Sequence, residues 1–286
     1  MPYRKQKLFG QIKPPLGAVL DWGDPINNGL VGRWLFNEGA GNKVRDLCKL
    51  NHGTLTNMAY TGASGWLNNG KFGPAIKCDG TNDHINFGDV APFQFEYTSK
   101  FSLVSWFRTT LTGTDEFVMS KNLNSGTFRG YLIDVQANKI IFSLQNTNVG
   151  NGYSYVTGVT TVTDGRWHQV VCTYSGTGGC SGELIYVDGR EDGTTVGLDQ
   201  LGSRTILSAA PLIIGGRQSG GVPFNGSVDN ASVYNRVLKP SEIARLYTEP
   251  FAGIVAPRIG MRQSPLVVPY WAFARQRARV IGAGVS

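Results

Sequence analysis

Apolar and polar residues alternate along most of the chain, in short runs that are separated by glycine-rich turns. The clearest runs are DGRWHQVVCTY at residues 164–174 and ELIYVDG at residues 183–189. Their period of two and their many β-branched and aromatic residues predict two strands. The Asp188-Gly189 pair supplies the positive φ angles of a tight hairpin turn, so we expect a third strand directly after it.

Runs of this kind recur about every ten residues, which is the spacing of a two-sheet antiparallel sandwich. One helix is well marked over residues 239–247, because Pro240 suits the first helical position and Glu242 favours the positive end of the helix dipole. The further strands are predicted at residues 30–36, 51–55, 75–80, 84–88, 101–108, 117–120, 131–135, 139–144, 212–216 and 224–234.

The net charge of +7 is concentrated at the two ends of the chain. The basic residues there have no acidic neighbours in the same segments, together give +9, and leave −2 for residues 21–250. We therefore predict a basic extended N-terminal arm at residues 1–28, one domain at residues 29–250 and a basic C-terminal arm at residues 251–286. The terminal basic residues are Arg4, Lys5, Lys7, Lys13, Arg258, Arg262, Arg275, Arg277 and Arg279.

This charge distribution argues against a uniformly basic surface that binds nucleic acid. The arms can dock on an acidic protein surface or on nucleic acid, or they can remain solvated. The YWAF run at residues 270–273 is too apolar for a free tail. We expect it to pack on its own domain or on a partner chain.

The N-terminal residues do not resemble a secretion signal, because Gln11, Lys13 and the prolines that follow interrupt any apolar core. No apolar run is long enough to insert into a membrane. The four cysteines show no CxxC spacing, so we do not expect zinc. Cys172 and Cys180 flank the turn of the first hairpin and are expected to be thiols unless the mature protein meets an oxidising exterior.

Six motifs follow one another in a fixed order between residues 29 and 250. They are GLVGRWLFNEGAG at 29–41, NHGTL at 51–55, KCDG at 77–80, the hairpin at 164–189, FNGSVD at 224–229 and SEIARLY at 241–247. In this order they resemble the laminin-G-like jelly-roll modules of the concanavalin A-like lectin/glucanase superfamily. The resemblance implies an all-β, two-sheet antiparallel jelly-roll sandwich, with the last long strand beside the first and one short C-terminal helix closing one side.

Related modules often hold a calcium ion between the first and last strands. The resemblance therefore implies a Ca²⁺ site at Asn37, Glu38 and Asp229, with Asp46 as a weaker candidate, because hard oxygen ligands suit this ion. Asn230 stands where the family has a second carboxylate and can offer only a neutral oxygen. The alternative is that these side chains cap turns and bind backbone groups.

The chain is not expected to be an enzyme. Glucanases of the superfamily carry a Glu-x-Asp-x-x-Glu run, and the seven glutamates of this chain do not have that spacing. His168 is expected to be packed or hydrogen-bonded rather than catalytic, and His52 and His84 have no clustered metal-binding partners. The aromatic residues in apparent loops can stack on sugar rings or can pack within the loops; they are Trp66, Tyr153 and Tyr155.

The two basic arms, and the KPPLG run at 13–17 that leads into Asp21-Trp22, resemble virion proteins of tailed bacteriophages. We therefore expect a non-enzymatic virion surface protein, a capsid decoration or fibre-like component that is made in the host cytoplasm. Its arms would bind capsid or other virion proteins, its sandwich would face outward and bind glycans, and the chain can form a homo-oligomer. The alternatives are a free carbohydrate-binding lectin and a glycoside hydrolase.

Overall fold

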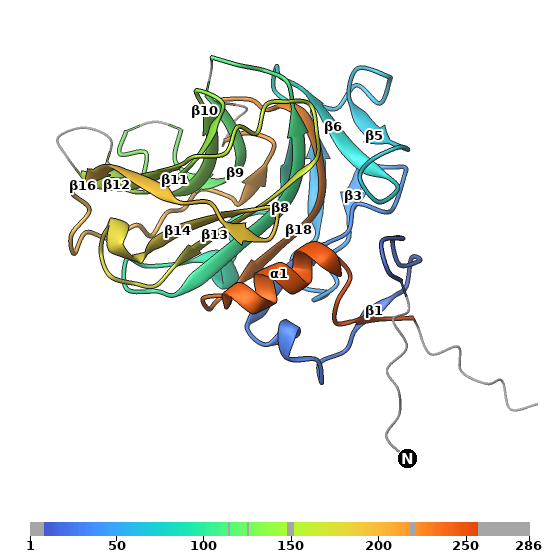
Figure 1. The fold of residues 1–286 in the computed structure, drawn as a ribbon. Helices are drawn as coiled ribbons and strands as arrows, with labels where there is room; N and C mark the ends of the chain where they lie inside the picture. Colours follow the sequence, from blue (N-terminus) through green and yellow to red (C-terminus); the bar gives the residue numbers. More distant parts are fainter. Residues whose placement is uncertain (1–8, 114, 125, 148–151, 218–220, 257–286) are drawn as a thin grey trace, which may run out of the picture. The chain divides into compact units, whose positions relative to one another are not determined.

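Two antiparallel sheets form the body of the protein, as Figure 1 shows. The structure is a computed structural model that describes residues 9–113, 115–124, 126–147, 152–217 and 221–256. The sheets, together with one short helix, confirm the predicted all-β jelly-roll sandwich. The hairpin turn at Asp188 and Gly189 has the expected positive φ angles of 52° and 80°.

The nine-stranded sheet contains most of the middle of the chain. In spatial order its strands are β16 (Thr194–Asp199), β12 (Gly152–Gly158), β11 (Lys139–Thr147), β10 (Gly130–Gln136), β9 (Glu116–Asn122), β17 (Ile213–Ile214), β7 (His84–Asn86), β4 (Gly53–Thr56) and β3 (Lys43–Val44).

The eight-stranded sheet contains the predicted hairpin and the first and last long strands. In spatial order its strands are β15 (Arg190–Glu191), β14 (Glu183–Val187), β13 (His168–Tyr174), β8 (Phe101–Thr109), β18 (Asn225–Tyr234), β6 (Ala75–Asp79) and β5 (Gly65–Leu67), while β2 (Leu30–Trp34) pairs with β18. The last long strand therefore lies beside the first.

Alternation along β8 divides the buried residues between two hydrophobic layers. Phe101, Leu103 and Phe107 belong to the main core between the sheets. Val104 and Trp106 point the other way, into a second core beneath α1 (Pro240–Thr248). The Trp106 ring stacks on that of Tyr247 at 5.5 Å. Helix α1 therefore covers the outer face of the eight-stranded sheet (Figure 1).

Residues 9–28, which the sequence assigns to an extended arm, lie on the sandwich. Strand β1 (Val19–Leu20) pairs with β19 (Ile254–Val255), so the first and last described segments are neighbours. Leu20 and Ile26 are buried in the same core as α1. The pattern in the sequence missed this packing because the apolar residues of the segment are separated by prolines and glycines, and their partners are more than 200 residues away.

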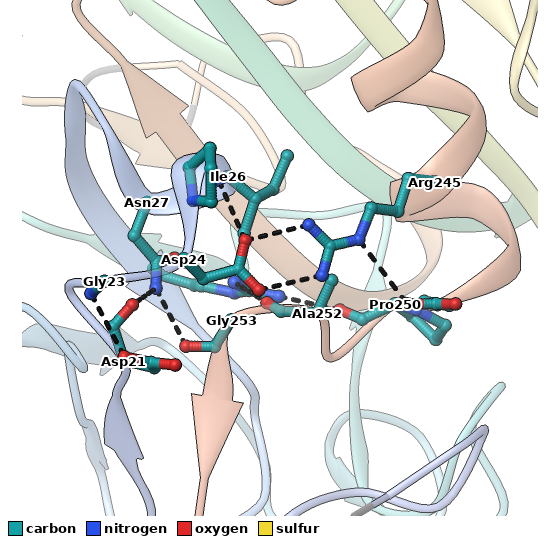
Figure 2. A network of polar contacts seen from close by, with 12 residues as sticks. Asp21, Gly23, Asp24, Ile26, Asn27, Arg245, Pro250, Ala252 and Gly253 are labelled. Carbon is teal, nitrogen blue, oxygen red and sulfur yellow. Dashed lines mark hydrogen bonds and ion pairs between the residues drawn. The ribbon is translucent and has the colours of Figure 1, made fainter. Parts of the chain in front are cut away.

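A polar network joins this N-terminal segment to helix α1 and to residues 250–253 (Figure 2). Asp24 caps the short helix η1 (Pro25–Asn27) and accepts two hydrogen bonds of 2.8 Å from Arg245. Asn27 donates to the Gly253 carbonyl at 2.8 Å. The buried Arg33 guanidinium donates to the carbonyls of residues 250 and 252. Residues 251–256 are thereby part of the domain rather than of an arm.

Two further short helices, η2 (Ala91–Phe93) and η3 (Cys180–Gly182), precede β8 and β14. The sulfurs of Cys172 and Cys180 are free thiols, and so are those of the other two cysteines. No helix within the described residues is long and apolar enough to cross a membrane.

Candidate functional site

Three of the four residues predicted to bind calcium hold backbone groups in separate places. Asn37 Nδ2 donates to the Pro14 carbonyl at 2.8 Å. Glu38 Oε1 accepts from the Arg45 amide at 2.7 Å. Asp46 accepts from the backbone amides of residues 33, 48 and 51, and so holds a turn. These contacts agree with the alternative interpretation of the sequence, in which the side chains cap turns and bind backbone groups.

The cation beside Asp229 is the ammonium group of Lys13. Lys13 Nζ lies 2.6 Å from Asp229 Oδ1, and the two side chains are only 5% and 0% exposed. Burial raises the pKa of Asp229 to about 6, and the Lys13 ammonium opposes this rise. Asn230 donates its amide to the Pro250 carbonyl instead of facing Asp229.

The predicted ligands therefore do not fit a calcium ion. Asn37 donates through its amide nitrogen, Glu38 Oε1 accepts from the Arg45 amide, and the buried Asp229 carboxylate is already paired with the Lys13 ammonium. Within the part of the chain that the structure describes, no three His, Cys, Asp or Glu side chains gather into a group that could hold a metal ion.

His168 lies at the start of β13, between two carboxylates. Its Nδ1 is 2.9 Å from Asp188 Oδ2, and its Nε2 is 3.1 Å from Asp164 Oδ1. The bond to Asp188, followed by that to Asp164, raises the pKa of His168 against the opposing effect of burial. Asp188 also accepts from the Gln169 amide, so the cluster fixes the ends of the β13–β14 hairpin.

An open pocket of about 700 Å³ lies between the turn after β2 and the loops around β5. Its aromatic residues are Tyr60, whose side chain is 50% exposed, and the half-buried Trp66. Trp66 Nε1 donates to the Gly41 carbonyl at 2.7 Å, which ties the indole to the opposite wall. We call this the Tyr60–Trp66 pocket; its full lining is Gly39, Ala40, Gly41, Asn42, Tyr60, Trp66 and Asn68.

The backbone at this pocket is unusual for an exposed aromatic residue. Tyr60 has a φ of 54°, in the left-handed region that costs a side-chain-bearing residue free energy. A Cβ at Gly65, whose φ is 106°, would lie 3.1 Å from the Tyr60 Cα. Glycine is therefore needed at position 65 for the β4–β5 loop to close against β5.

The sequence identified only part of this pocket. It singled out Trp66, but as a loop residue, whereas Trp66 lies on β5. Tyr60 and the two asparagines were missed, because an isolated tyrosine in a polar loop gives no pattern. Their convergence depends on the pairing of β5 with β6 and on the turn that follows β2.

Tyr153 and Tyr155 belong to a second, smaller groove of about 320 Å³ on the nine-stranded sheet. They lie on β12 rather than in a loop, with nearly parallel rings 6.0 Å apart. Asp134 and Arg217 also line this groove. Burial raises the pKa of Asp134 to about 8.

Comparison with known proteins places the fold in a family. A family model described as Laminin_G_3, concanavalin A-like lectin/glucanases superfamily, matches residues 79–244, which is more than half of the chain. A curated protein of Rattus norvegicus, the sushi, von Willebrand factor type A, EGF and pentraxin domain-containing protein 1, is 29% identical over 103 residues. That match covers 34% of this chain and 3% of the rat protein, so the chain spans a small fraction of the relative's length.

Two solved structures are similar at the level of the fold. The binding domain of Paraclostridial Mosquitocidal Protein 1 has a TM-score of 0.59 and 15% identity, over 79% of this chain and 53% of that one. Domain 4 of AbnA, an extracellular arabinanase of Geobacillus stearothermophilus solved with arabinotriose, has a TM-score of 0.53 and 15% identity, over 76% of this chain and 98% of that one. These two similarities concern the fold, and the family match over more than half of the chain shows that the chain belongs to the concanavalin A-like lectin/glucanase superfamily.

Proposed function

We propose that the protein is a non-enzymatic, glycan-binding component of a virion surface, and that the Tyr60–Trp66 pocket is its glycan site. The proposal rests on Tyr60, whose side chain is exposed and whose backbone is in the left-handed region, beside the Trp66 indole that is held by a hydrogen bond. Aromatic faces pack against the apolar faces of sugar rings, and the amides of Asn42 and Asn68 can bind hydroxyl groups. The volume also lies within the range of small-molecule sites.

The family membership and one solved neighbour support this proposal. The arabinanase domain was solved with arabinotriose, an oligosaccharide, and this chain covers nearly all of that domain. At 15% identity the likeness concerns the fold, so the assignment of the pocket rests on the residues that line it.

The positions of the carboxyl groups with raised pKa values support the non-enzymatic part of the proposal. Glu183 is buried among β13, β14 and β12 and accepts a hydrogen bond from Ser154. Asp134 accepts from the Glu116 amide at 3.0 Å. Neither lines the Tyr60–Trp66 pocket, and neither do Asp83, Glu116 and Asp229, whose pKa values burial also raises. Asp83 interacts electrostatically with Tyr60, but none of the residues that line the pocket carries a carboxyl group. We expect no turnover of bound glycans, in contrast to the glycoside hydrolase alternative.

Replacement of Tyr60 by alanine should weaken glycan binding about tenfold, which corresponds to about 1.4 kcal/mol. The reason is the loss of the exposed ring face, and stability should change little because the side chain is half exposed. A glycan array would identify a ligand, and titration calorimetry with that ligand would compare the variants. Trp22→Ala is the matched control, since Trp22 is 61% exposed and lies outside the pocket.

Three results would count against this assignment. The wild-type protein could bind no glycan on the array, or Tyr60→Ala could bind as tightly as wild type. Binding could also be lost in Tyr153→Ala and retained in Tyr60→Ala, which would move the site to the groove on the nine-stranded sheet.

The anchoring part of the proposal is supported by the pairing of β1 with β19. This pairing places residues 19–20 of the N-terminal segment beside residues 254–255, which precede the basic C-terminal sequence. The sequence beyond residue 256 carries five arginines and no acid, and residues 1–8 add Arg4, Lys5 and Lys7. Two basic segments that are attached to one domain suit an acidic surface on a capsid or other virion protein, with the protein assembled after synthesis in the host cytoplasm.

Deletion of residues 257–286 should leave the melting temperature and glycan binding unchanged but release the protein from its particle. The expected loss of particle binding comes from the removal of five positive charges, and added salt should mimic it. Co-sedimentation with particles at low and high ionic strength measures the effect. A variant with all five arginines changed to lysine keeps the charge and should still sediment; sedimentation of the deleted protein with the particles would contradict the anchoring role.

A further inference from the structure

The residues that line the Tyr60–Trp66 pocket come from three segments, which are the turn at residues 39–42, Tyr60 in the loop after β4, and Trp66 and Asn68 on and after β5. We call the first and the third of these segments, each with its flanking residues, the two walls. The first wall, residues 36–42, follows β2 and supplies the glycine-rich turn and Asn42. The second wall, residues 65–74, runs from β5 to the start of β6 and supplies Trp66 and Asn68. Within the described residues, the hydrogen bond from Trp66 to Gly41 is the direct polar link between these walls.

Lys13 contacts both walls. Its ammonium donates to the Phe36 carbonyl of the first wall at 3.1 Å and to the Pro74 carbonyl of the second wall. It also pairs with Asp229 of β18 at 2.6 Å. An ammonium has three N–H donors, and these three oxygens lie around it in a site where its side chain is only 5% exposed.

Asp229 and the residue after Lys13 add two more links. Asp229 Oδ2 accepts from the Phe72 amide of the second wall at 3.1 Å. A β-bulge at Asp229, with Asn230 at a φ of 52°, breaks the register of β18 against β8 at this point. Bulges commonly re-aim a side chain in this way. The Pro14 carbonyl accepts from Asn37 of the first wall.

We infer that Lys13 is a positioning residue that holds the two walls of the pocket together, and that its ammonium takes the place in which the sequence predicted a calcium ion. The inference that this matters for glycan binding rests on the proposed function of the pocket. The clamp itself rests only on the contacts of Lys13 and Asp229. A buried carboxylate that loses its cation is strongly destabilised, so the walls should loosen when the ammonium is removed.

Lys121 provides a matched control. Its ammonium is also buried, and it contacts Asp89 Oδ1 at 2.7 Å and the carbonyls of Ser208 and Ala210 at 2.9 and 2.5 Å. These partners belong to neither wall of the pocket. Lys121→Met therefore removes a buried ammonium from one carboxylate and two carbonyls at a different place, with the difference that Asp89 is 37% exposed whereas Asp229 is buried.

The test measures native-state hydrogen exchange in Lys13→Met and Lys121→Met. We expect Lys13→Met to speed exchange of residues 36–42 and 65–74 by about tenfold or more relative to wild type, whereas Lys121→Met leaves these segments at the wild-type rate. Excess EDTA should change neither wall in the wild-type protein. Equal exchange of both walls in the two variants, or faster exchange of the wild-type walls with EDTA, would overturn the inference.

If Lys13→Met does not fold, the double variant Lys13→Met with Asp229→Asn removes both buried charges and should fold with loosened walls. Wild-type-like walls in that variant would also overturn the clamp. For a glycan that binds wild type, Lys13→Met should raise Kd about tenfold and Lys121→Met should not. Failure of wild type to bind any glycan would remove the proposed function, while the exchange measurement would still decide the clamp.

Discussion

Deletion of residues 1–28 is expected to lower the free energy of unfolding by more than about 5 kcal/mol, which is comparable with the whole stability of many domains. The deletion removes the Lys13 ammonium from the buried Asp229 carboxylate, and breaking a buried pair in this way costs about 3–5 kcal/mol. It also removes the buried side chains of Leu20 and Ile26 from the core beneath α1.

Denaturant unfolding of the full and shortened chains would measure this loss. The chain without residues 257–286 serves as the control of similar length and should unfold at the wild-type midpoint. If the chain without residues 1–28 unfolds at the same denaturant concentration as the full chain, the N-terminal segment is not part of the domain. A large loss would place the start of the domain well before residue 29.

The second large effect is a pH dependence of the free energy of unfolding, which we expect from Glu183. Burial raises the pKa of Glu183 to about 8, against the opposing hydrogen bond from Ser154. Between the unfolded pKa of about 4.3 and this value, the folded state binds more protons than the unfolded state. The contribution of Glu183 to stability therefore falls as pH rises from about 4 to about 8.

Glu183→Gln should remove this loss, because the amide remains neutral and can still accept from Ser154. We expect the variant to be more stable than wild type at pH 9, by about 2–5 kcal/mol, and to differ little from it at pH 4. Thermal unfolding across this pH range measures the difference. Glu191→Gln changes an exposed glutamate and should leave the pH profile as in wild type. Parallel profiles for Glu183→Gln and wild type would contradict this account of the site.

A sequence motif predicted the position of Asp229 but did not predict its partner. The FNGSVD motif correctly placed Asp229 on the long strand beside β2. The resemblance to modules that hold calcium between the first and last strands implied a metal there, because hard oxygen ligands suit Ca²⁺. The partner in the structure is Lys13, more than 200 residues away in a segment that looked like a free arm. Only the folded chain shows which cation reaches the carboxylate.

The sequence by itself determined the two-sheet sandwich, the β13–β14 hairpin and helix α1, and its resemblance to the family implied the return of the last long strand beside the first. These features depend on local periodicity, on turn residues and on the order of motifs, all of which are written along the chain. The tertiary structure alone decided the docking of residues 9–28, the Lys13–Asp229 pair and the meeting of Tyr60, Trp66 and the β2 turn in one pocket. These features are contacts between different segments of the chain. A buried polar or charged group is stabilised only by the partner that the fold brings to it, so a local pattern in the sequence does not predict these contacts.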